Sequence, residues 1–374
     1  MPVTVRWTSD VAQIAALETA WRDLHDAAPV RTPLAGPDYL LPWYQHYGGR
    51  SGVPLLGSAW QGGALVGLAP LVLRPGRVGA VPVRCVQFAA AGAEAGEFLL
   101  GDGRAEVAGA FLDALTGAVR FDVARFNLLD PGSAEYEALR LAAARAGMAV
   151  ETVPTSYATV DLSAGYEAYL RRLTAKFRGN LKRRRRAIEA AGAPALEGVH
   201  FEADPGAIDR SVERMFAVAN ASWKARRAGP LAAPHRAFYR DLARRFGARG
   251  QLDLAILTVG GRDRAYMLGV AERGVYYDVT LSFDEAARPL APGVVLTQEV
   301  LRRLAARGIH TFVSHGVHDY KRYFATALTE RRRAIVFARG PRAALSRALR
   351  FSLAPLWRRL GLARPAVETP LSAA

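Results

Sequence analysis

Two patterns of apolar residues alternate along this chain of 374 residues. Short apolar runs, such as ALVGLAPLVL at 64–73 and QLDLAILTV at 251–259, are typical of strands. Between these runs, apolar residues recur at spacings of three and four, which indicates amphipathic helices. The alternation predicts an α/β (α+β) fold, in which a mixed, mostly antiparallel sheet is flanked by helices.

The first half begins with helices and continues with a meander. Asp10 is the predicted N-cap of the first helix, and a second helix at 38–47 is interrupted by Pro42. Glycines separate three strand candidates at 55–60, 64–73 and 82–88, which predicts antiparallel pairing. The other predicted elements are helices at 104–118 and 134–146 and strands at 3–7, 121–129, 149–153 and 156–162.

The second half has the same order of elements, starting with one long helix predicted over 165–190. Further predicted elements are helices at 206–226, 234–247 and 294–308 and strands at 198–203, 251–259, 265–273, 275–282, 310–314 and 331–338. We therefore predict an N-terminal domain at 1–160, a C-terminal domain at 161–340, and a basic amphipathic segment with a flexible tail at 341–374.

Charge distinguishes the two halves. Residues 1–160 carry 12 Lys and Arg and 15 Asp and Glu, a net charge of −3, whereas the remainder carries a net charge of +19. This asymmetry indicates that the second half faces an anion: nucleic acid, a membrane surface or a phosphorylated ligand. The single cysteine, Cys85, excludes an internal disulfide and is expected in the core. The N-terminus has neither a basic leader nor an apolar signal core, so we expect a cytoplasmic protein.

Pro292 and Gly293 open a predicted helix directly after a strand and a loop. The first N–H groups of a helix have no partner within the helix, and its dipole favours an anion there. Arg288, five residues earlier, is a candidate partner of a phosphate. Pro at a helix start is also ordinary capping, so the turn on its own does not decide between the two.

A basic run extends from Arg171 to Arg186, with nine basic residues and no acidic one. Nucleic-acid or membrane binding is the functional interpretation, and a solvated arginine-rich helix is the plain one. Farther along, Trp223 is expected to pack in the core, while Lys224 is a candidate to point into a cleft.

The segment SHGVHDYKRYF, at 314–324, follows a predicted strand and is rich in polar side chains. His315 and His318 are spaced as metal ligands on one helical face, but the sequence places no third ligand beside them. We therefore expect no metal. The sequence also contains no zinc spacing of Cys and His, no phosphate-binding glycine loop and no nucleophile elbow.

Four motifs in order resemble one family. They are Trp21 and Leu24 followed by Pro33, Tyr39, Leu40 and Trp43; then Arg178, Asn180 and Arg183; then Ala291, Pro292 and Gly293; and last Gly316, Tyr320, Lys321 and Arg322. Over residues 5–340 the chain resembles the GNAT-superfamily acyltransferases of the CelD/BcsL type, which are associated with bacterial cellulose and exopolysaccharide biosynthesis.

The resemblance implies two tandem GNAT-like domains, as in the Fem-type aminoacyltransferases, the first without a cofactor site. It also implies that the strand before the Pro-Gly turn separates from its neighbour to admit the pantetheine of an acyl-CoA. The pyrophosphate would rest on the amides of Gly293, Val294 and Val295, next to Pro292. The family usually has an acid where this chain has Val317, and often one in the preceding strand.

Acyl transfer to an amine needs a base, donors for the oxyanion and an acid for the leaving thiolate. We assign the acid to Tyr320, with Tyr323 as second choice, and the base to His315, His318 or Asp319. A histidine near its ordinary pKa suits that role. Lys321 is assigned to a phosphate or carboxylate. The remaining candidates for substrate or anion binding are Arg178, Asn180, Arg183, Trp223, Lys224 and Asp278.

Three functions remain open. The first is N-acyl transfer, with acetyl-CoA or another acyl-CoA as co-substrate, to a sugar- or lipid-linked amine in cell-envelope or exopolysaccharide biosynthesis. The second is Fem-type transfer from aminoacyl-tRNA, which we rank lower. The third is a catalytically degenerate scaffold on the inner face of an anionic membrane, anchored by the basic amphipathic segment that starts at Arg342.

Overall fold

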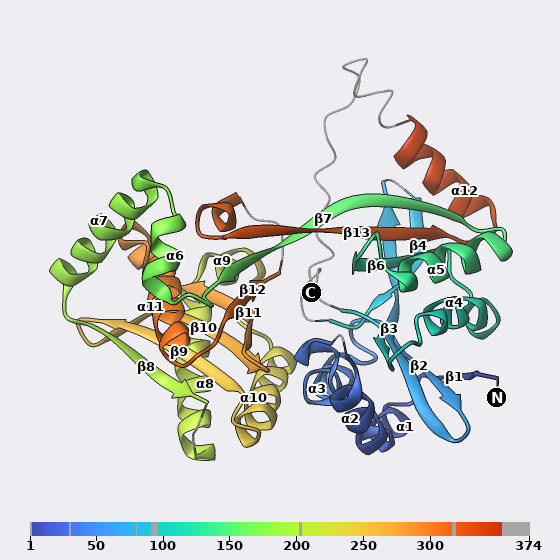
Figure 1. The fold of residues 1–374 in the computed structure, drawn as a ribbon, viewed down its shortest axis with the longest axis horizontal. Helices are drawn as coiled ribbons and strands as arrows, with labels where there is room; N and C mark the ends of the chain where they lie inside the picture. The colour runs from blue at the N-terminus through green and yellow to red at the C-terminus, as the bar shows by residue number, and fades with distance from the viewer. Residues whose placement is uncertain are drawn as a thin grey trace. The chain divides into compact units, whose positions relative to one another are not determined.

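The computed structural model describes residues 2–29, 31–79, 81–90, 96–201, 204–315 and 319–353, except for the side chains at 226–228, 319 and 320. The chain forms two compact units (Figure 1). Unit 1 comprises Met1–Thr155 and the part from Glu330 onward, and unit 2 comprises Ser156–Thr329. The division differs from the predicted ranges 1–160, 161–340 and 341–374. The chain returns to unit 1 because its last strand, β13 (Ala327–Phe337), pairs with β6 (Val123–Leu129).

Unit 1 starts with a strand and three helical segments and continues with a meander. Its other elements are β1 (Thr4–Thr8), α1 (Val11–Ala16), α2 (Glu18–Ala27), η1 (Pro33–Ala35), α3 (Pro37–Tyr47), β2 (Val53–Gln61), β3 (Ala64–Val78), β4 (Val81–Phe88), β5 (Leu99–Leu100), α4 (Glu106–Ala118), α5 (Ala134–Arg145), the start of β7 (Ala149–Asp161), α12 (Pro341–Arg347) and η4 (Ala348–Leu353).

The sheet of unit 1 has the strand order β1-β2-β3-β4-β6-β13. Strands β1 to β4 are antiparallel neighbours, which confirms the predicted meander. Strand β6 then pairs with β4 in parallel, after the chain has crossed over through α4. A parallel neighbour requires such a crossover, whereas antiparallel neighbours need only a turn.

Helices α4 and α5 pack closely in unit 1. A Cβ added at Gly109 of α4 would lie 2.8 Å from the carbonyl oxygen of Ala138 in α5, so glycine allows this approach. Phe111 and Phe126 fill the core beneath them. Helix α3 continues through Pro42, so the predicted interruption there is wrong.

Unit 2 contains the elements of the second half. They are the end of β7, α6 (Tyr166–Arg172), α7 (Ala175–Ala191), β8 (Pro194–His200), α8 (Pro205–Asn220), α9 (Trp223–Ala228), α10 (Ala233–Ala248), β9 (Leu252–Val259), β10 (Arg262–Glu272), β11 (Val275–Phe283), η2 (Glu285–Leu290), α11 (Pro292–Ala306), β12 (Thr311–Ser314) and η3 (Asp319–Tyr323).

The sheet of unit 2 has the strand order β7-β12-β11-β10-β9-β8. Strands β8 to β11 are antiparallel neighbours, and β12 pairs with β11 in parallel after the crossover through α11. The order of meander, crossover helix and parallel strand is therefore common to both units. The predicted α/β (α+β) class, with a mostly antiparallel sheet flanked by helices, is confirmed.

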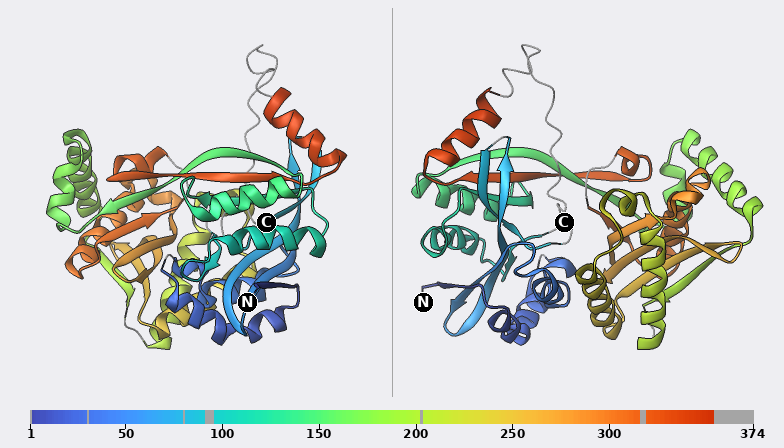
Figure 2. Two further views of the ribbon diagram at one scale, coloured as in Figure 1. Left: turned by 45° about the vertical axis from the view of Figure 1, so that its right-hand side comes forward. Right: turned by 180° about the vertical axis from the view of Figure 1, so that it is seen from behind.

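Helices cover both faces of the unit 2 sheet. All eight residues of β9 are buried, which requires cover on both sides. Helices α6, α7 and α11 contribute Tyr169, Ile188 and Leu296 to one core cluster, together with alternate residues of β9 and β10. Helices α8 and α10 lie side by side in Figures 1 and 2 and contact the same sheet.

The single helix predicted over 165–190 is wrong, because the chain forms α6 and α7 instead. Thr174 is extended, and its side chain accepts a hydrogen bond from the amide of Phe177, which starts a new helix. The guanidinium of Arg178 donates to the carbonyls of Arg171 and Leu173 at the end of α6. The predicted helix at 206–226 is likewise divided, with Ser222 at the N-cap of α9.

Candidate active site

Strands β11 and β12 separate in the middle of the unit 2 sheet. They pair in parallel from Val275 opposite Thr311 as far as Asp278 opposite Ser314. Strand β11 then continues to Phe283, and among the described strands only β10 pairs with this last part. Val279 is an extra residue in the ladder with β10, a bulge at the point of separation. The open edge of β11 offers backbone donors and acceptors to a ligand.

Asp278 lies at the point of separation. Its Oδ2 accepts a hydrogen bond of 2.7 Å from Oγ of Ser314. Its Oδ1 is buried and has no hydrogen-bond partner within the described structure. Burial raises the pKa of Asp278, although Lys321, Ser314 and Lys224 act in the opposite direction. A buried acceptor without a donor is unfavourable, so Oδ1 is suited to bind a ligand ammonium or hydroxyl.

Two lysines flank Asp278. Lys321 of η3 is buried, and its ammonium donates to the carbonyl of His315. Lys224 of α9 is an exposed residue, and its Nζ lies 3.4 Å from the carbonyl oxygen of Leu281 on β11. Removal of its ammonium from water lowers the pKa of Lys224, and Asp278 opposes this shift. The structure thus brings Lys321, which sequence reasoning assigned to a phosphate or carboxylate, close to Lys224 and Asp278, which it assigned to substrate or anion binding.

His315 follows β12 and lies between two tyrosines. Its ring stacks on Tyr277 at a centroid distance of 6.4 Å and meets the edge of Tyr157 at 5.7 Å. Burial, with a smaller contribution from Lys321, lowers the pKa of His315 to about 4. The expectation of a histidine near its ordinary pKa is therefore wrong for His315. Its imidazole is neutral throughout the neutral range and is a weak base.

The first turn of α11 lies beside β11. Ala291 is left-handed, with φ of 51°, and Pro292 is the first helical residue. The amides of Val294 and Val295 donate to the carbonyl of Ala291 at 3.0 and 3.4 Å. The third predicted amide, that of Gly293, takes part in no hydrogen bond of the described structure. An anion at this helix start would therefore bind chiefly to the Gly293 amide.

Arg288 is already engaged near this turn. Its guanidinium pairs with the carboxylate of Glu285 within η2, and the side chain is 61% exposed. The pKa of Arg288 is raised by this hydrogen bond. To bind a phosphate, Arg288 would have to exchange its partner.

The motif of Arg178, Asn180 and Arg183 lies on α7. Arg178 joins α6 to α7, so its guanidinium has a structural role. Oδ1 of Asn180 accepts hydrogen bonds from Arg183 at 2.8 Å and from Arg184 at 3.3 Å. Arg183 is exposed and has no acidic partner among the described residues. Helix α7 contacts both α11 and η2, and Arg185 of α7 pairs with Glu299 of α11 at 3.3 Å.

Several predicted residues lie outside the described structure. These are Gly316, Val317 and His318, together with the side chains of Asp319 and Tyr320. Tyr323, the second choice for the acid, is 64% exposed and stacks on Phe177 of α7 at 6.2 Å. Trp223 is 39% exposed at the start of α9, so its predicted core position is wrong.

Sequence reasoning missed a polar group around the same strand. Tyr239 of α10 and Tyr266 of β10 both hydrogen-bond to the side chain of Thr280, and burial raises the pKa of each tyrosine. Oγ of Ser282 is buried and has no partner in the described structure. Strand β11 carries polar side chains at three alternate positions, Asp278, Thr280 and Ser282. Such alternation in a central strand was the sequence signal that could have indicated this polar group.

Residues 175–322 match the model of the acetyltransferase (GNAT) domain family. This range contains the separation of β11 and β12, the Gly293 turn and both lysines. The prediction of a GNAT-type acetyltransferase domain is thus confirmed for this part of the chain. The chain matches none of the curated proteins.

Solved structures show the same fold over nearly the whole chain. The crystal structure of FemX aligns with a TM-score of 0.55 and 11% identity, covering 96% of this chain and 100% of that one. The C-terminal DUF2156 domain of a putative lysylphosphatidylglycerol synthetase from Agrobacterium fabrum aligns with a TM-score of 0.55 and 14% identity, covering 90% and 95%. A conserved protein of unknown function from Bacteroides thetaiotaomicron aligns with a TM-score of 0.52 and 10% identity, covering 89% and 100%. At these identities the likeness concerns the fold alone.

Proposed function

We propose that the chain is an N-acyltransferase that takes an acyl group, in the first place acetyl, from CoA. Its acceptor would be an amine on a sugar- or lipid-linked molecule in cell-envelope or exopolysaccharide biosynthesis, as the CelD/BcsL resemblance implies. The observation that carries the proposal is the separation of β11 and β12 at Asp278, beside the start of α11, within the range that matches the acetyltransferase domain.

The described residues suit an acyl-CoA. The open edge of β11 offers hydrogen-bonding groups to an amide-containing arm, and the Gly293 amide offers a donor to a phosphate. Lys224 and the exposed cations of α7, among them Arg183, supply positive charge nearby. When bound, an acyl-CoA supplies an acyl group activated as a thioester.

Asp278 is the residue that we place at the acceptor amine. Its unpartnered Oδ1 would accept a hydrogen bond from the amine and take the proton that nitrogen loses as it forms its new bond to the acyl carbon. The raised pKa makes this carboxylate a better base than an exposed aspartate. His315 is neutral and packs against Tyr277, so we give it a positioning role. Tyr320 remains our choice for the proton that the leaving sulfur takes up.

Substitution of Gly293 tests the proposed phosphate position. We expect Gly293→Glu to weaken acetyl-CoA binding at least tenfold, because a carboxylate would lie where the phosphates bind. An acidic residue in the first turn stabilises a helix, so loss of binding would not reflect loss of α11. Gly293→Ala is the matched control, because its Cβ would lie 3.4 Å from Leu281 and Phe283, an acceptable contact distance.

Titration calorimetry with acetyl-CoA and longer acyl-CoAs measures both variants. The proposal predicts binding to the wild-type chain, similar binding to Gly293→Ala and weak binding to Gly293→Glu. Equal affinity of the two variants would contradict the phosphate position. Absence of binding to every acyl-CoA would contradict the function.

Fem-type transfer from aminoacyl-tRNA is the second candidate, and the surface of α7 supports it. Lys176, Lys182, Arg183 and Arg186 are exposed and have no acidic partner among the described residues. FemX shares the fold.

If the chain takes aminoacyl-tRNA, tRNA binding would weaken steeply with salt. Replacing Lys182, Arg183 and Arg186 by Gln would flatten the slope of log K against log salt by about 0.7–0.9 for each phosphate that the variant no longer neutralises. A mobility-shift titration at several salt concentrations measures the slope; absent or salt-independent binding excludes this candidate.

A further inference from the structure

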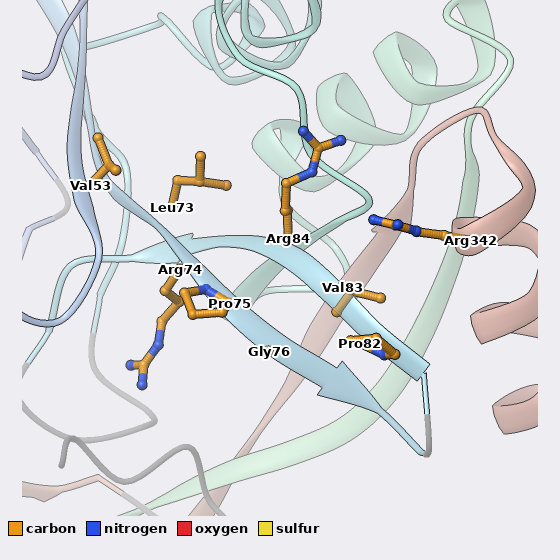
Figure 3. Close-up of a pocket in the computed structure, with 9 residues that line it drawn as sticks. All are labelled: Val53, Leu73, Arg74, Pro75, Gly76, Pro82, Val83, Arg84 and Arg342. Atoms are coloured by element: carbon orange, nitrogen blue, oxygen red, sulfur yellow. The ribbon is translucent and has the colours of Figure 1, made fainter.

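Unit 1 has a depression of about 360 Å³, whereas the candidate active site lies in unit 2. Its walls come from β3, β4 and α12, with one residue of β2 (Figure 3). The apolar part is formed by Leu73, Pro75, Pro82 and Val83, and Val53 lies at its margin with 50% of its surface exposed. A depression of this kind accepts an apolar chain rather than a fully hydrated ion.

Three arginines from three elements line the depression. They are Arg74 of β3, Arg84 of β4 and Arg342 of α12, and no acidic residue lines the depression. Arg74 and Arg84 project from opposite faces of the β3–β4 pair, because Arg74 lies opposite Cys85 and Arg84 opposite Pro75. Arg84 pairs with Asp122 at 3.5 Å. Arg74 and Arg342 have no acidic partner among the described residues. Figure 3 draws Arg84 and Arg342 on one side of the depression and Arg74 on the other.

The arginines come from two parts of unit 1 with opposite net charge. Arg74 and Arg84 lie within residues 1–160, which carry a net charge of −3, whereas Arg342 belongs to the part from Glu330 onward, which has ten Arg and two Glu in the sequence. An arginine without an acid, beside an apolar floor, is matched by an anion that carries an apolar body.

The neighbouring helical segment exposes further apolar side chains. Ala343 and Phe351 attach α12 and η4 to a small core cluster that also contains Val83. Leu345, three residues after Arg342, is 52% exposed, and Leu353 is 37% exposed. Exposed leucines next to an arginine without an acidic partner, as at Leu345 and Arg342, are typical of segments that lie on an anionic bilayer, with the leucines in the acyl boundary and the arginine at a phosphate.

We propose that the surface formed by this depression and by α12 and η4 binds anionic phospholipids at a membrane face. The phosphate of a lipid would lie between Arg342 and Arg84 or at Arg74, and the adjoining acyl chain would cover Leu73 and the exposed Leu345. Free phosphate accounts for the arginines but leaves the apolar floor and the exposed leucines without a partner. None of the described helices is long and apolar enough to cross a membrane. The inference concerns unit 1 and is independent of the proposed acyl transfer.

Co-sedimentation of the full chain with vesicles tests this surface. We expect binding to vesicles of phosphatidylcholine mixed with phosphatidylglycerol and little binding to phosphatidylcholine alone. Each basic residue at such a surface contributes a factor of about five to the partition coefficient. The double variant Arg74→Glu with Arg342→Glu should therefore lose at least 25-fold, roughly the product of two such factors. The matched control Arg120→Glu with Arg262→Glu makes the same change of net charge at two exposed positions outside the depression.

A second pair of variants separates the apolar contribution from the charge. Leu345→Ser should reduce binding several-fold, whereas Leu141→Ser, at a leucine of α5 that is 46% exposed, should not. Equal loss of vesicle binding in the Arg74/Arg342 and the Arg120/Arg262 double variants would show that only net charge matters and would overturn the proposal. Displacement from the vesicles by millimolar inorganic phosphate would overturn it in favour of a phosphate site, and displacement by RNA in favour of a nucleic-acid surface.

Discussion

Replacing Asp278 by asparagine is expected to lower kcat/KM for acyl transfer by about 10²–10⁴-fold, the usual contribution of a positioned acid or base. The same change should leave the stability of unit 2 unaltered or higher. The raised pKa of Asp278 means that burial disfavours its ionised form, and the amide of asparagine has no charge to bury. Loss of activity together with retained stability distinguishes a functional carboxylate from a structural one.

Asp209→Asn is the control for this change. Asp209 is a partly exposed residue of α8 that pairs with Arg244 at 2.7 Å, and this hydrogen bond lowers its pKa. The control should keep full activity. Steady-state kinetics and urea unfolding of both variants give the comparison. Equal activity of Asp278→Asn and the wild type would exclude the proposed base.

The pH dependence of stability and of activity follows from the upward shift of the Asp278 pKa. The folded state keeps the Asp278 proton to a higher pH than the unfolded state, so this group contributes stability at low pH that is lost as pH rises through the raised pKa. Activity needs the ionised form, so kcat/KM should rise with pH through a midpoint above about 3.9, the ordinary aspartate value. His315, with its pKa at about 4, should add no step at neutral pH. A step near neutral pH that disappears in His315→Gln would contradict the assignment of the base to Asp278.

Removing Arg303 should cause the largest loss of stability. Asp253 of β9 is fully buried, and one nitrogen of Arg303 in α11 donates to both of its oxygens at 2.6 and 2.7 Å. Nδ1 of His200 lies 2.8 Å from the same carboxylate. Arg303→Met would leave a buried carboxylate without its cation, which typically costs about 3–5 kcal/mol.

Arg302→Met is the matched control, one residue earlier on the same helix. Arg302 is 59% exposed and pairs with Glu299, and an exposed pair contributes about 0–1 kcal/mol. Hydrogen exchange of the amides of β9 and α11 measures the loss within unit 2. Arg303→Met combined with Asp253→Leu should recover much of the stability, because both charges are then absent. Equal protection in Arg302→Met and Arg303→Met would contradict the role of this ion pair.

Local patterns predicted most elements of the fold. Both meanders follow from apolar runs separated by glycines, and the start of α11 follows from Pro292 and Gly293. The errors arose where a local signal competed with a longer pattern. The apolar stripe over 165–190 keeps its helical spacing past Thr174, and it therefore predicted a single helix. The chain nevertheless starts a new helix there, because the Thr174 side chain caps α7. Trp223 was placed in the core on the residue type alone, but α9 leaves it at the surface.

The candidate site required the tertiary structure. Asp278 and Ser314 are 36 residues apart, and they meet because β12 pairs with β11 in one particular register. A shift of one residue would turn each side chain to the other face of the sheet, and the hydrophobic pattern of so short a strand does not specify that choice. Lys224 of α9 and Lys321 of η3 act electrostatically on the same carboxylate, although no sequence spacing relates either element to it.

The sequence by itself determined the α/β class, the mostly antiparallel meanders, the basic helix and the Pro-Gly helix start, because each depends on residues close together in the chain. Only the tertiary structure decided where β11 and β12 separate, which charged groups share the buried carboxylate of Asp278, and that the chain returns to unit 1 through β13. These features depend on strand register and on the loss of water around charged groups, and both arise from contacts between distant segments.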